Sequence, residues 1–399
     1  MIDAPNSFTA LPAARLRLAV VLTALLALAL PATGATGLDL GALLGDEDRP
    51  TGCVEPTRSL TLYAEELEPF GDGRTRLGYG LAPGEATTPG PLIEMVEGEC
   101  LAVTLVNDVP EETLRELRDD PTTGSGDPSM PLGVSLHVHG VKYTASSDGT
   151  FETLSHVPSG ESRTAVWYAA PQTVKGSELT SQGTAGAWWY HDHTVGTSHG
   201  TAGQNAGLVG GLMVRRAGEP RPDHTYTVVF GDDNTVNYRR FPETDTCDPD
   251  DPVPSNTCFV AQEGDDVEFL VIGIGDEFHT FHIHGHAWAD NRTGRLAGPT
   301  DATPIIDNRT LGPGDSFAAR VTAGELTQPA SWMLHCHVQE HSDAGMATSF
   351  HVLPRGGGSI DDLPGGHHHD GQADPSVADR DAHEAHALGA RAGEDGGAA

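Results

Sequence analysis

The sequence predicts an all-β protein made of two β-sandwich domains. Short apolar runs recur along the chain with Gly, Pro and Asp between them, as is typical of strands and turns. Clear examples are 60–64, 101–106, 225–230 and 267–272. A helical pattern is limited to the short segment 111–118. Both halves share one layout, with strands, a first histidine cluster, and a second cluster near the end, which favours two packed sandwiches with a break near 217–222.

The chain is expected to have four parts. These are a signal peptide at 1–35, a first domain at 53–218, a second domain at 222–355, and a disordered His/Asp/Gly-rich tail at 356–399. The mature length of about 365 residues is enough for two domains and a tail. The tail has too few large apolar residues to bury a core, so its histidines either capture metal or reflect biased composition.

The N-terminal segment has the order of a secretory signal peptide. Arg15 and Arg17 precede an apolar run at 18–30, and small residues follow at 31–36. The run is shorter than the roughly 20 residues that a membrane-spanning helix needs. The two arginines are not adjacent, so a twin-arginine signal is not evident. We therefore expect an exported protein, periplasmic or extracellular, without membrane association after cleavage; a retained anchor is the alternative.

The charge balance limits the partners. The formal net charge is −34, with 57 acidic residues against 23 Lys and Arg. Nucleic acids and anionic membranes are bound by basic side chains that displace counterions, so this composition argues against both. It favours neutral or cationic small molecules as substrates.

Histidines gather in four short clusters, at 136–140, 190–193, 279–286 and 332–341. Each cluster contains a His-x-His pair, and alternate side chains of an extended segment share a face, so both members of a pair point the same way. Cys336 lies between His335 and His337 and therefore points to the opposite face. A Cys with two His and a weak Met ligand, here Met346, is the donor set of a blue electron-transfer copper. The segment thus predicts a covalent bridge between such a copper and a second metal cluster.

In this order, the four clusters resemble the copper-binding motifs of the multicopper oxidases, and the chain resembles the two-domain bacterial members called small laccases. The resemblance runs from about residue 57 to about residue 354 and includes the stretches 146–150 and 288–294. It implies two cupredoxin-like Greek-key β-sandwich domains, with a blue copper site in the second domain only.

The resemblance also implies ligands for four coppers. The type 1 copper would take His279, Cys336, His341 and the axial Met346. The type 2 copper would take His137 and His282. The type 3 pair would take His139, His191 and His337 on one copper, and His193, His284 and His335 on the other. His199 and His286 have no ligand role but lie near the clusters, where they are candidates to orient ligands.

The function that the resemblance implies is that of a laccase. Phenolic or aromatic amine substrates would be oxidised one electron at a time at the type 1 copper, and dioxygen would be reduced to water by four electrons at a trinuclear copper cluster. Two linked domains pair once at most within a chain, so the resemblance further implies a homotrimer with trinuclear centres at the subunit interfaces. Asp148 is the candidate proton relay, with Tyr143 as a nearby phenol; an ordinary turn residue is the alternative for Asp148.

Three other functions are weighed against the laccase. A metal-ion oxidase acting on Cu(I), Fe(II) or Mn(II) shares every copper ligand and stays open. A copper nitrite reductase has its blue-copper motif in the first domain, and a simple electron carrier would leave eight histidines unused. Six methionines without a cluster disfavour a dedicated Cu(I) oxidase, whereas the acidic loop 245–251 is a candidate cation dock.

Four cysteines remain once Cys336 is assigned to copper, and an even number in an exported chain permits two disulfides. Cys247 and Cys258 bracket an acidic, proline-rich loop and are the expected pair. Cys53 with Cys100 then follows by elimination, while the sequence leaves the other two connectivities open.

Overall fold

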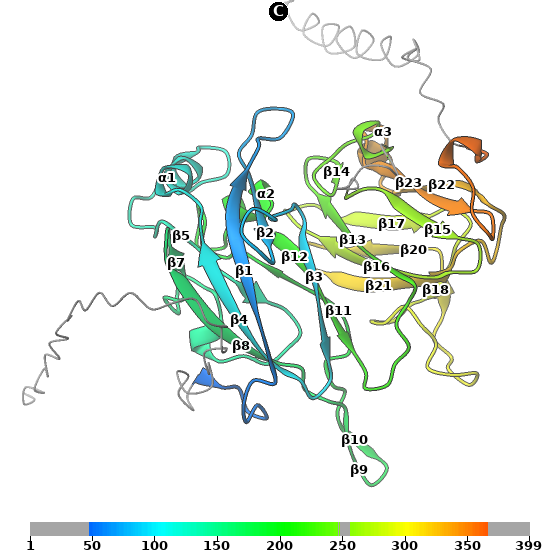
Figure 1. The fold of residues 1–399 in the computed structure, drawn as a ribbon, viewed down its shortest axis with the longest axis horizontal. Helices are drawn as coiled ribbons and strands as arrows, with labels where there is room; N and C mark the ends of the chain where they lie inside the picture. The colour runs from blue at the N-terminus through cyan, green and yellow to red at the C-terminus, as the bar shows by residue number, and fades with distance from the viewer. Residues whose placement is uncertain (1–47, 246, 248–255, 366–399) are drawn as a thin grey trace, which may run out of the picture. The chain divides into compact units, whose positions relative to one another are not determined.

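The computed structural model describes residues 48–245, 247 and 256–365. The signal peptide predicted at 1–35 lies outside these residues, and so does the predicted tail from 366 to 399. The described chain consists mostly of β-strands with a few short helices (Figure 1), which confirms the all-β prediction. None of the helices in this described part is long and apolar enough to cross a bilayer.

The described part of the first half, from residue 48, contains twelve strands. They are β1 (Arg58–Leu67), β2 (Arg76–Gly80), β3 (Gly90–Val96), β4 (Cys100–Asn107), β5 (Gly133–Val134), β6 (His137–Val138), β7 (Val157–Pro158), β8 (Ser162–Tyr168), β9 (Thr173–Lys175), β10 (Glu178–Ser181), β11 (Gly186–His191) and β12 (Val209–Arg215). The helices of this half are α1 (Glu111–Asp119), the 3-10 turn η3 (Ala145–Ser147) and α2 (Thr201–Ala206). The helical pattern predicted at 111–118 is thus α1.

Two four-stranded sheets form the first sandwich, in the orders β2-β1-β4-β8 and β3-β12-β11-β6. The β1–β4 and β3–β12 pairs are parallel, and their partners are not consecutive in the sequence, so the chain crosses between the sheets as a Greek key requires. The core between the sheets includes Leu62, Leu105, Trp167, Tyr190 and Leu212.

The second half repeats this plan. Its strands are β13 (His224–Gly231), β14 (Thr235–Val236), β15 (Phe259–Gln262), β16 (Asp266–Gly273), β17 (His279–Ile283), β18 (Trp288–Ala289), β19 (Ile305–Ile306), β20 (Asn308–Leu311), β21 (Ser316–Thr322), β22 (Ala330–Cys336) and β23 (Ala347–Leu353). Its helices are η4 (Glu243–Asp245), α3 (Gln339–Asp343) and η5 (Ile360–Asp362).

The second sandwich pairs a sheet of order β14-β13-β16-β21 with one of order β15-β23-β22-β17-β20. Its core is rich in phenylalanine, with Phe230, Phe269, Phe281, Phe317 and Phe350 fully buried or nearly so. Both halves are therefore cupredoxin-like β-sandwiches, as the sequence predicts.

Strand β16 explains how the two halves join. Successive side chains of a strand alternate between faces, and the apolar run of β16 covers both. Phe269 and Val271 enter the second core, whereas Leu270 and Ile272 enter a separate cluster with Trp189 of the first half. A strand that is buried on both faces has an almost continuous apolar sequence, and β16 has such a sequence.

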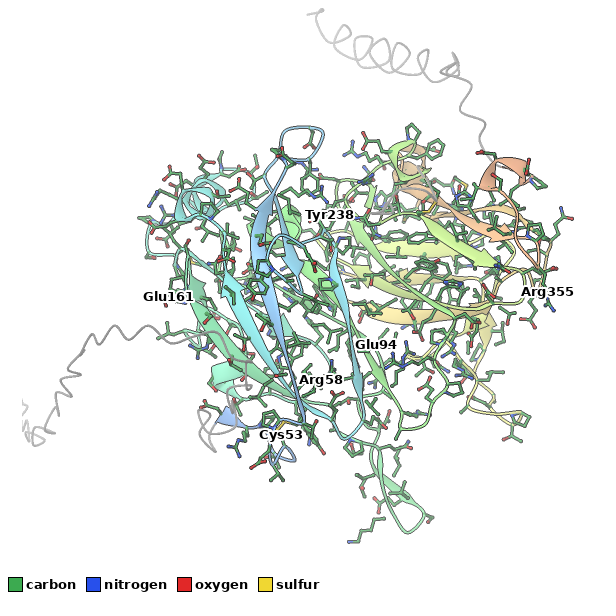
Figure 2. The ribbon with its side chains drawn as sticks, viewed as in Figure 1. Cys53, Arg58, Glu94, Glu161, Tyr238 and Arg355 are labelled. Carbon is green, nitrogen blue, oxygen red and sulfur yellow. A yellow bond between two sulfur atoms is a disulfide. The ribbon has the colours of Figure 1, made fainter. Side chains whose placement is uncertain are left out.

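A buried charge network accompanies this apolar contact. Arg215 of β12 pairs with Glu94 at 2.7 Å and with Glu268 of β16 at 2.8 Å. Arg320 of β21 lies 3.9 Å from Glu268 and pairs with Asp266 at 2.5 Å. The network therefore links strands of both halves, and Figure 2 labels Glu94 at its edge.

Both expected disulfides are present. Cys53 is bonded to Cys100 with a Cα–Cα distance of 5.5 Å, and Cys247 to Cys258 with 5.0 Å. Cys336 is a buried free thiol. The pairing left open by the sequence is thereby confirmed, and the one cysteine assigned to metal is left unbridged.

The beginning of the predicted tail differs from the expectation of disorder from residue 356. The chain forms the turn η5, and Leu363 is buried. The backbone N–H of Ser331 on β22 donates to the carbonyl of Pro364 at 2.9 Å. One apolar side chain and one backbone bond thus order a segment whose composition alone predicts disorder.

Candidate metal centres

Strand register brings the predicted ligands together. In the antiparallel pairing of β11 with β6, His191 lies opposite His137. In the pairing of β17 with β22, His282 lies opposite His335. Opposite residues of paired strands have their side chains on the same face. Each pairing therefore places two His-x-His pairs side by side and forms a group of four histidines.

The first group, called here the N-terminal tetrad, contains His137, His139, His191 and His193. The ring of His137 has its centroid 5.1 to 5.3 Å from the other three. The Nε2 atoms of His139 and His191 face each other at 3.1 Å. Two neutral imidazoles cannot both present lone pairs at that distance without repulsion, whereas a bound cation between the nitrogens would be attracted to both.

Backbone carbonyls orient three rings of the N-terminal tetrad. Nδ1 of His137 lies 2.6 Å from the carbonyl of Asp148, that of His191 lies 2.7 Å from the carbonyl of Asp192, and that of His193 lies 3.1 Å from the carbonyl of Ser198. A carbonyl can only accept, so each Nδ1 carries the proton and leaves Nε2 free as a metal ligand.

The second group, called here the C-terminal tetrad, contains His282, His284, His335 and His337. Nε2 of His284 and Nε2 of His335 face each other at 3.2 Å. Nδ1 of His282 donates to the carbonyl of Asp307 at 2.7 Å, and Nδ1 of His335 to that of Cys336 at 2.8 Å. The two tetrads therefore share one design.

Burial keeps several of these imidazoles neutral. Desolvation lowers the pKa of His139 to about 4, with the neighbouring histidines as a smaller cause. It also lowers the pKa of His137, His191, His284 and His335. Neutral imidazole is the form that binds metal. These histidines can therefore bind a cation without first releasing a proton from a charged imidazolium ring.

The third group has the predicted blue-copper residues. The donor atoms of His279, Cys336 and His341 all lie within 4.8 Å of one another. Nδ1 of His341 is 3.3 Å from Nδ1 of His279 and 3.7 Å from Sγ of Cys336. Met346 is fully buried, and its carbonyl accepts from the N–H of Cys336 at 3.1 Å.

The surroundings of Cys336 suit a thiolate bound to a cation. Burial raises the pKa of its thiol, while the N–H of Thr280, 3.4 Å from Sγ, acts in the opposite direction. A buried thiol of this kind ionises when a metal ion replaces its proton. Desolvation likewise lowers the pKa of His279 to about 4, with His341 as the second cause.

Glu277 is a residue at this group that the sequence reasoning missed. Its carboxylate lies 3.2 Å from Nε2 of His341 and is half exposed. The neighbouring Phe278 is 66% exposed. Glu277 lies just before β17 and contacts a residue that is distant in the sequence, so no local pattern indicated its role.

The structure places both candidate catalytic residues beside His137. The carboxylate of Asp148 lies 3.6 Å from Nδ1 of His137, and Thr150 donates to it at 2.7 Å. The ring of Tyr143 is 5.8 Å from that of His137, and its pKa is raised by burial and by Asp148. Asp148 thus lies in the turn that ends η3 and also approaches a candidate ligand.

Two further residues support the tetrads. Asp192 is fully buried, and its carboxylate accepts from the N–H groups of Ser135 and Val195, both at 2.7 Å. It thereby joins the segments that carry the two His-x-His pairs of the N-terminal tetrad. His286 donates from Nδ1 to the carbonyl of His284 at 2.9 Å and accepts from Gly324. These contacts match the orienting role considered for His286, whereas Asp192 was missed because its partners are distant in sequence.

The two tetrads are not brought together within the chain. Across residues 48–245, 247 and 256–365, each group of potential ligands comes from one half, and no ring contact or hydrogen bond joins the tetrads. The predicted type 2 pair, His137 with His282, is therefore divided between the tetrads. Each predicted type 3 set is divided in the same way, although two members of each set lie close together, His139 with His191 and His284 with His335.

The donor chemistry fits copper. Imidazole suits copper, and a group of two His and one Cys with a buried Met beside it is typical of blue-copper sites. Two cupredoxin-like sandwiches with these groups define the class of the molecule as a copper protein.

Comparisons with known proteins agree with this class. Residues 222–356 match the family model for multicopper oxidases. A probable nitrite reductase-hydroxylamine oxidoreductase fusion protein of Kuenenia stuttgartiensis is 31% identical over 287 residues, which are 69% of this chain and 28% of that protein. Ceruloplasmin of Rattus norvegicus is 27% identical over 250 residues, 55% of this chain and 21% of that protein. The chain thus spans about a quarter of the length of these relatives.

A solved structure described as a multicopper oxidase has the same fold. It aligns with a TM-score of 0.53 at 20% identity and covers 77% of this chain and 93% of its own. The family match of residues 222–356, the similarity to ceruloplasmin and the shared fold together support a two-domain multicopper oxidase.

Proposed function

We propose that this protein is a laccase-type multicopper oxidase. The observation that carries the proposal is the coexistence of one His–Cys–His–Met group with two histidine tetrads. When bound, copper would take single electrons from phenols or aromatic amines at the first group and deliver four of them to dioxygen at a trinuclear centre. The balance is one dioxygen, four electrons and four protons to two waters.

The protein's own part in electron transfer is the peptide around Cys336. Sγ of Cys336 lies in the blue-copper group, while His335 on the adjacent position lies in the C-terminal tetrad. The alternation of β22 makes this division necessary, because neighbours on a strand face opposite ways. Electrons would thus cross between the centres through a few covalent bonds.

We further propose that the trinuclear centre is completed by a second copy of the chain. Each tetrad offers four imidazoles, and the two tetrads do not meet within the described chain. A ring of three copies would place the N-terminal tetrad of one beside the C-terminal tetrad of the next, giving three equivalent centres and satisfying closed symmetry. Mass measurement under non-denaturing conditions tests the ring; a fully active monomer would refute it.

Asp148 is the proposed proton relay to the dioxygen site. Its carboxylate contacts the ring of His137 and is held by Thr150, so it can pass a proton at the edge of the tetrad without moving far. Tyr143 lies close to both residues, and we propose that its phenol side chain also donates to the dioxygen site.

A metal-ion oxidase is the second candidate, and Glu277 is the observation that favours it. A half-exposed carboxylate on the outer nitrogen of His341 could hold a cation such as Fe(II), Mn(II) or Cu(I) beside the electron entry point. The acidic loop predicted as a cation dock at 245–251 lies mostly outside the described residues.

Nitrite reduction and simple electron carriage explain less of the molecule. The name of the Kuenenia relative includes nitrite reductase, but either activity would leave most of the eight tetrad histidines without a role. The blue-copper group also lies in the second domain, opposite to the nitrite reductase arrangement considered from the sequence.

The test compares donors on the copper-loaded protein. Oxygen consumption is measured with a phenol, Fe(II), Mn(II) and Cu(I), together with the ratio of donor oxidised to dioxygen consumed. A laccase should oxidise the phenol with a ratio of four, and Glu277→Gln should affect metal ions far more than a neutral phenol. Turnover of a metal ion alone, lost in Glu277→Gln, would replace laccase by metal-ion oxidase. Reduction of nitrite without dioxygen would reject both.

We also propose that the protein is exported, to the periplasm or to the extracellular space. Two disulfides are compatible with folding in an oxidising compartment, the periplasm or the extracellular space.

A further inference from the structure

A cavity of about 440 Å³ lies between the β1–β2 turn and the segment after β14. Its lining contains four arginines, namely Arg74, Arg76, Arg239 and Arg240. The whole chain has only 23 Lys and Arg against 57 acidic residues, so this concentration of positive charge is opposite to the balance elsewhere. Figure 2 labels Tyr238, which forms part of the cavity wall.

Two of the arginines already have partners. Arg74 forms ion pairs with Asp72, at 2.7 Å, and with Asp233. Nε of Arg240 donates to the backbone carbonyl of Asp233 at 2.6 Å. These bonds fix the rim of the cavity, whose lining also contains the carboxyl groups of Asp72 and Glu243.

The other two arginines are not compensated in this way. Within the described residues, neither Arg76 nor Arg239 has a carboxylate in ion-pair contact, and Nε of Arg76 is buried without a hydrogen-bond partner. Burial, together with the charge of Arg239, lowers the pKa of Arg76. Two neighbouring guanidinium groups with a buried, unpaired N–H favour the binding of an anion, because uncompensated buried charge is costly.

The aromatic wall limits the shape of the anion. Phe70 and Tyr238 stack with ring centroids 5.7 Å apart and an interplanar angle of 15°. The guanidinium carbon of Arg76 lies 5.6 Å from the Phe70 centroid. The hydroxyl of Tyr238 donates to the carbonyl of Gln204 at 2.7 Å, which holds that ring in place. A flat ligand can therefore lie along preformed aromatic and guanidinium surfaces.

We propose that this cavity binds an aromatic carboxylate, with the carboxylate on Arg76 and Arg239 and the ring beside Phe70 and Tyr238. Guanidinium groups bind carboxylates through paired, charge-assisted hydrogen bonds, and the volume is within the usual range for small-molecule sites.

The cavity adjoins the segment that carries Met346. The N–H of Phe241, one of the lining residues, donates to the carbonyl of Gly345 at 2.9 Å. A ligand in the cavity would therefore lie near the blue-copper group without touching its ligands. Binding itself does not depend on copper, so the inference stands apart from the proposed oxidase activity.

The test is calorimetric titration of the metal-free, full-length protein at low ionic strength. Benzoate is the probe, benzamide is the neutral molecule of the same shape, and inorganic phosphate supplies charge without a ring. We expect saturable binding of one benzoate per chain, and binding of benzamide and phosphate weaker by about tenfold or more, since a charge-assisted hydrogen bond contributes on this scale.

Two arginine variants locate the site. Arg239→Gln and Arg76→Gln should each weaken benzoate binding by about tenfold or more. Lys175→Gln is the matched control, since it removes the same charge from the exposed strand β9. Thermal melting of each variant verifies folding, and two variants keep the test valid if one fails to fold.

Three results would overturn the proposal. They are the absence of saturable benzoate binding, equal binding by a folded arginine variant and by Lys175→Gln, and equal affinity for benzoate and benzamide. Phosphate binding as tight as benzoate would also overturn it, because the cavity would then recognise charge without an aromatic ring.

Discussion

Replacing Glu268 by Gln should destabilise the protein by about 3 kcal/mol, because a buried charge network loses one of its anions. The side chains of Glu268, Arg215 and Arg320 are 2%, 4% and 3% exposed. Removing one partner of a buried pair typically costs about 3–5 kcal/mol. The lower end applies here, since Arg215 keeps Glu94 at 2.7 Å and Arg320 keeps Asp266 at 2.5 Å.

Urea unfolding followed by tryptophan fluorescence and by circular dichroism measures this change, and a thermal scan provides a second estimate. A loss of about 3 kcal/mol corresponds to a fall of roughly 6–12 °C in Tm for a domain of this class. Glu152→Gln is the control, because Glu152 is exposed and loses the same charge. That change should alter the free energy of unfolding by less than about 0.5 kcal/mol.

Equal unfolding midpoints for Glu268→Gln and Glu152→Gln would refute the reasoning. The network would then contribute orientation between β12, β16 and β21 without net stability, as some buried ion pairs do.

Three further predictions concern the tetrads and the blue-copper group. Asp148→Asn should slow reoxidation of the copper-loaded enzyme by dioxygen roughly 100-fold while leaving its reduction by donors unchanged in stopped-flow absorbance, and Asp127→Asn should do neither. In the metal-free protein, stability should fall as the pH drops from about 6.5 to about 4, because His139 and His279 stay neutral when folded while unfolded imidazoles take up protons. Equal urea midpoints at both ends of that range would contradict this. Asp192→Asn should cost about 2–4 kcal/mol, since one of its oxygens is replaced by a donor facing backbone N–H groups, and an unchanged melting temperature would show that the carboxylate is dispensable.

The parts of the site that the sequence could predict are those governed by local geometry. The His-x-His pairs and the opposite direction of Cys336 follow from a period of two along a strand, and the observed registers of His191 with His137 and His282 with His335 obey it. The sandwiches could be predicted for the same reason, since apolar runs such as that of β16 are strand-length and bounded by turns.

The missed parts depend on contacts between segments that are distant in the sequence. Asp192 accepts hydrogen bonds from Ser135, 57 positions away. Glu277 reaches His341 only because the short helix α3 returns the chain to β17. The arginine cavity similarly joins the β1–β2 turn to the segment after β14. No periodicity in one segment carries information of this kind.

The separation of the two tetrads has a genetic consequence under the ring arrangement that we propose. A chain with a damaged N-terminal tetrad would still offer a sound C-terminal tetrad to its neighbour, and the reverse would hold for a chain altered at His282. Two inactive variants, refolded together, should therefore regain activity in mixed rings, although neither does so alone. Conversely, a single defective chain should inactivate the trinuclear centre that it shares with an intact neighbour. Such mutations would therefore be partly dominant.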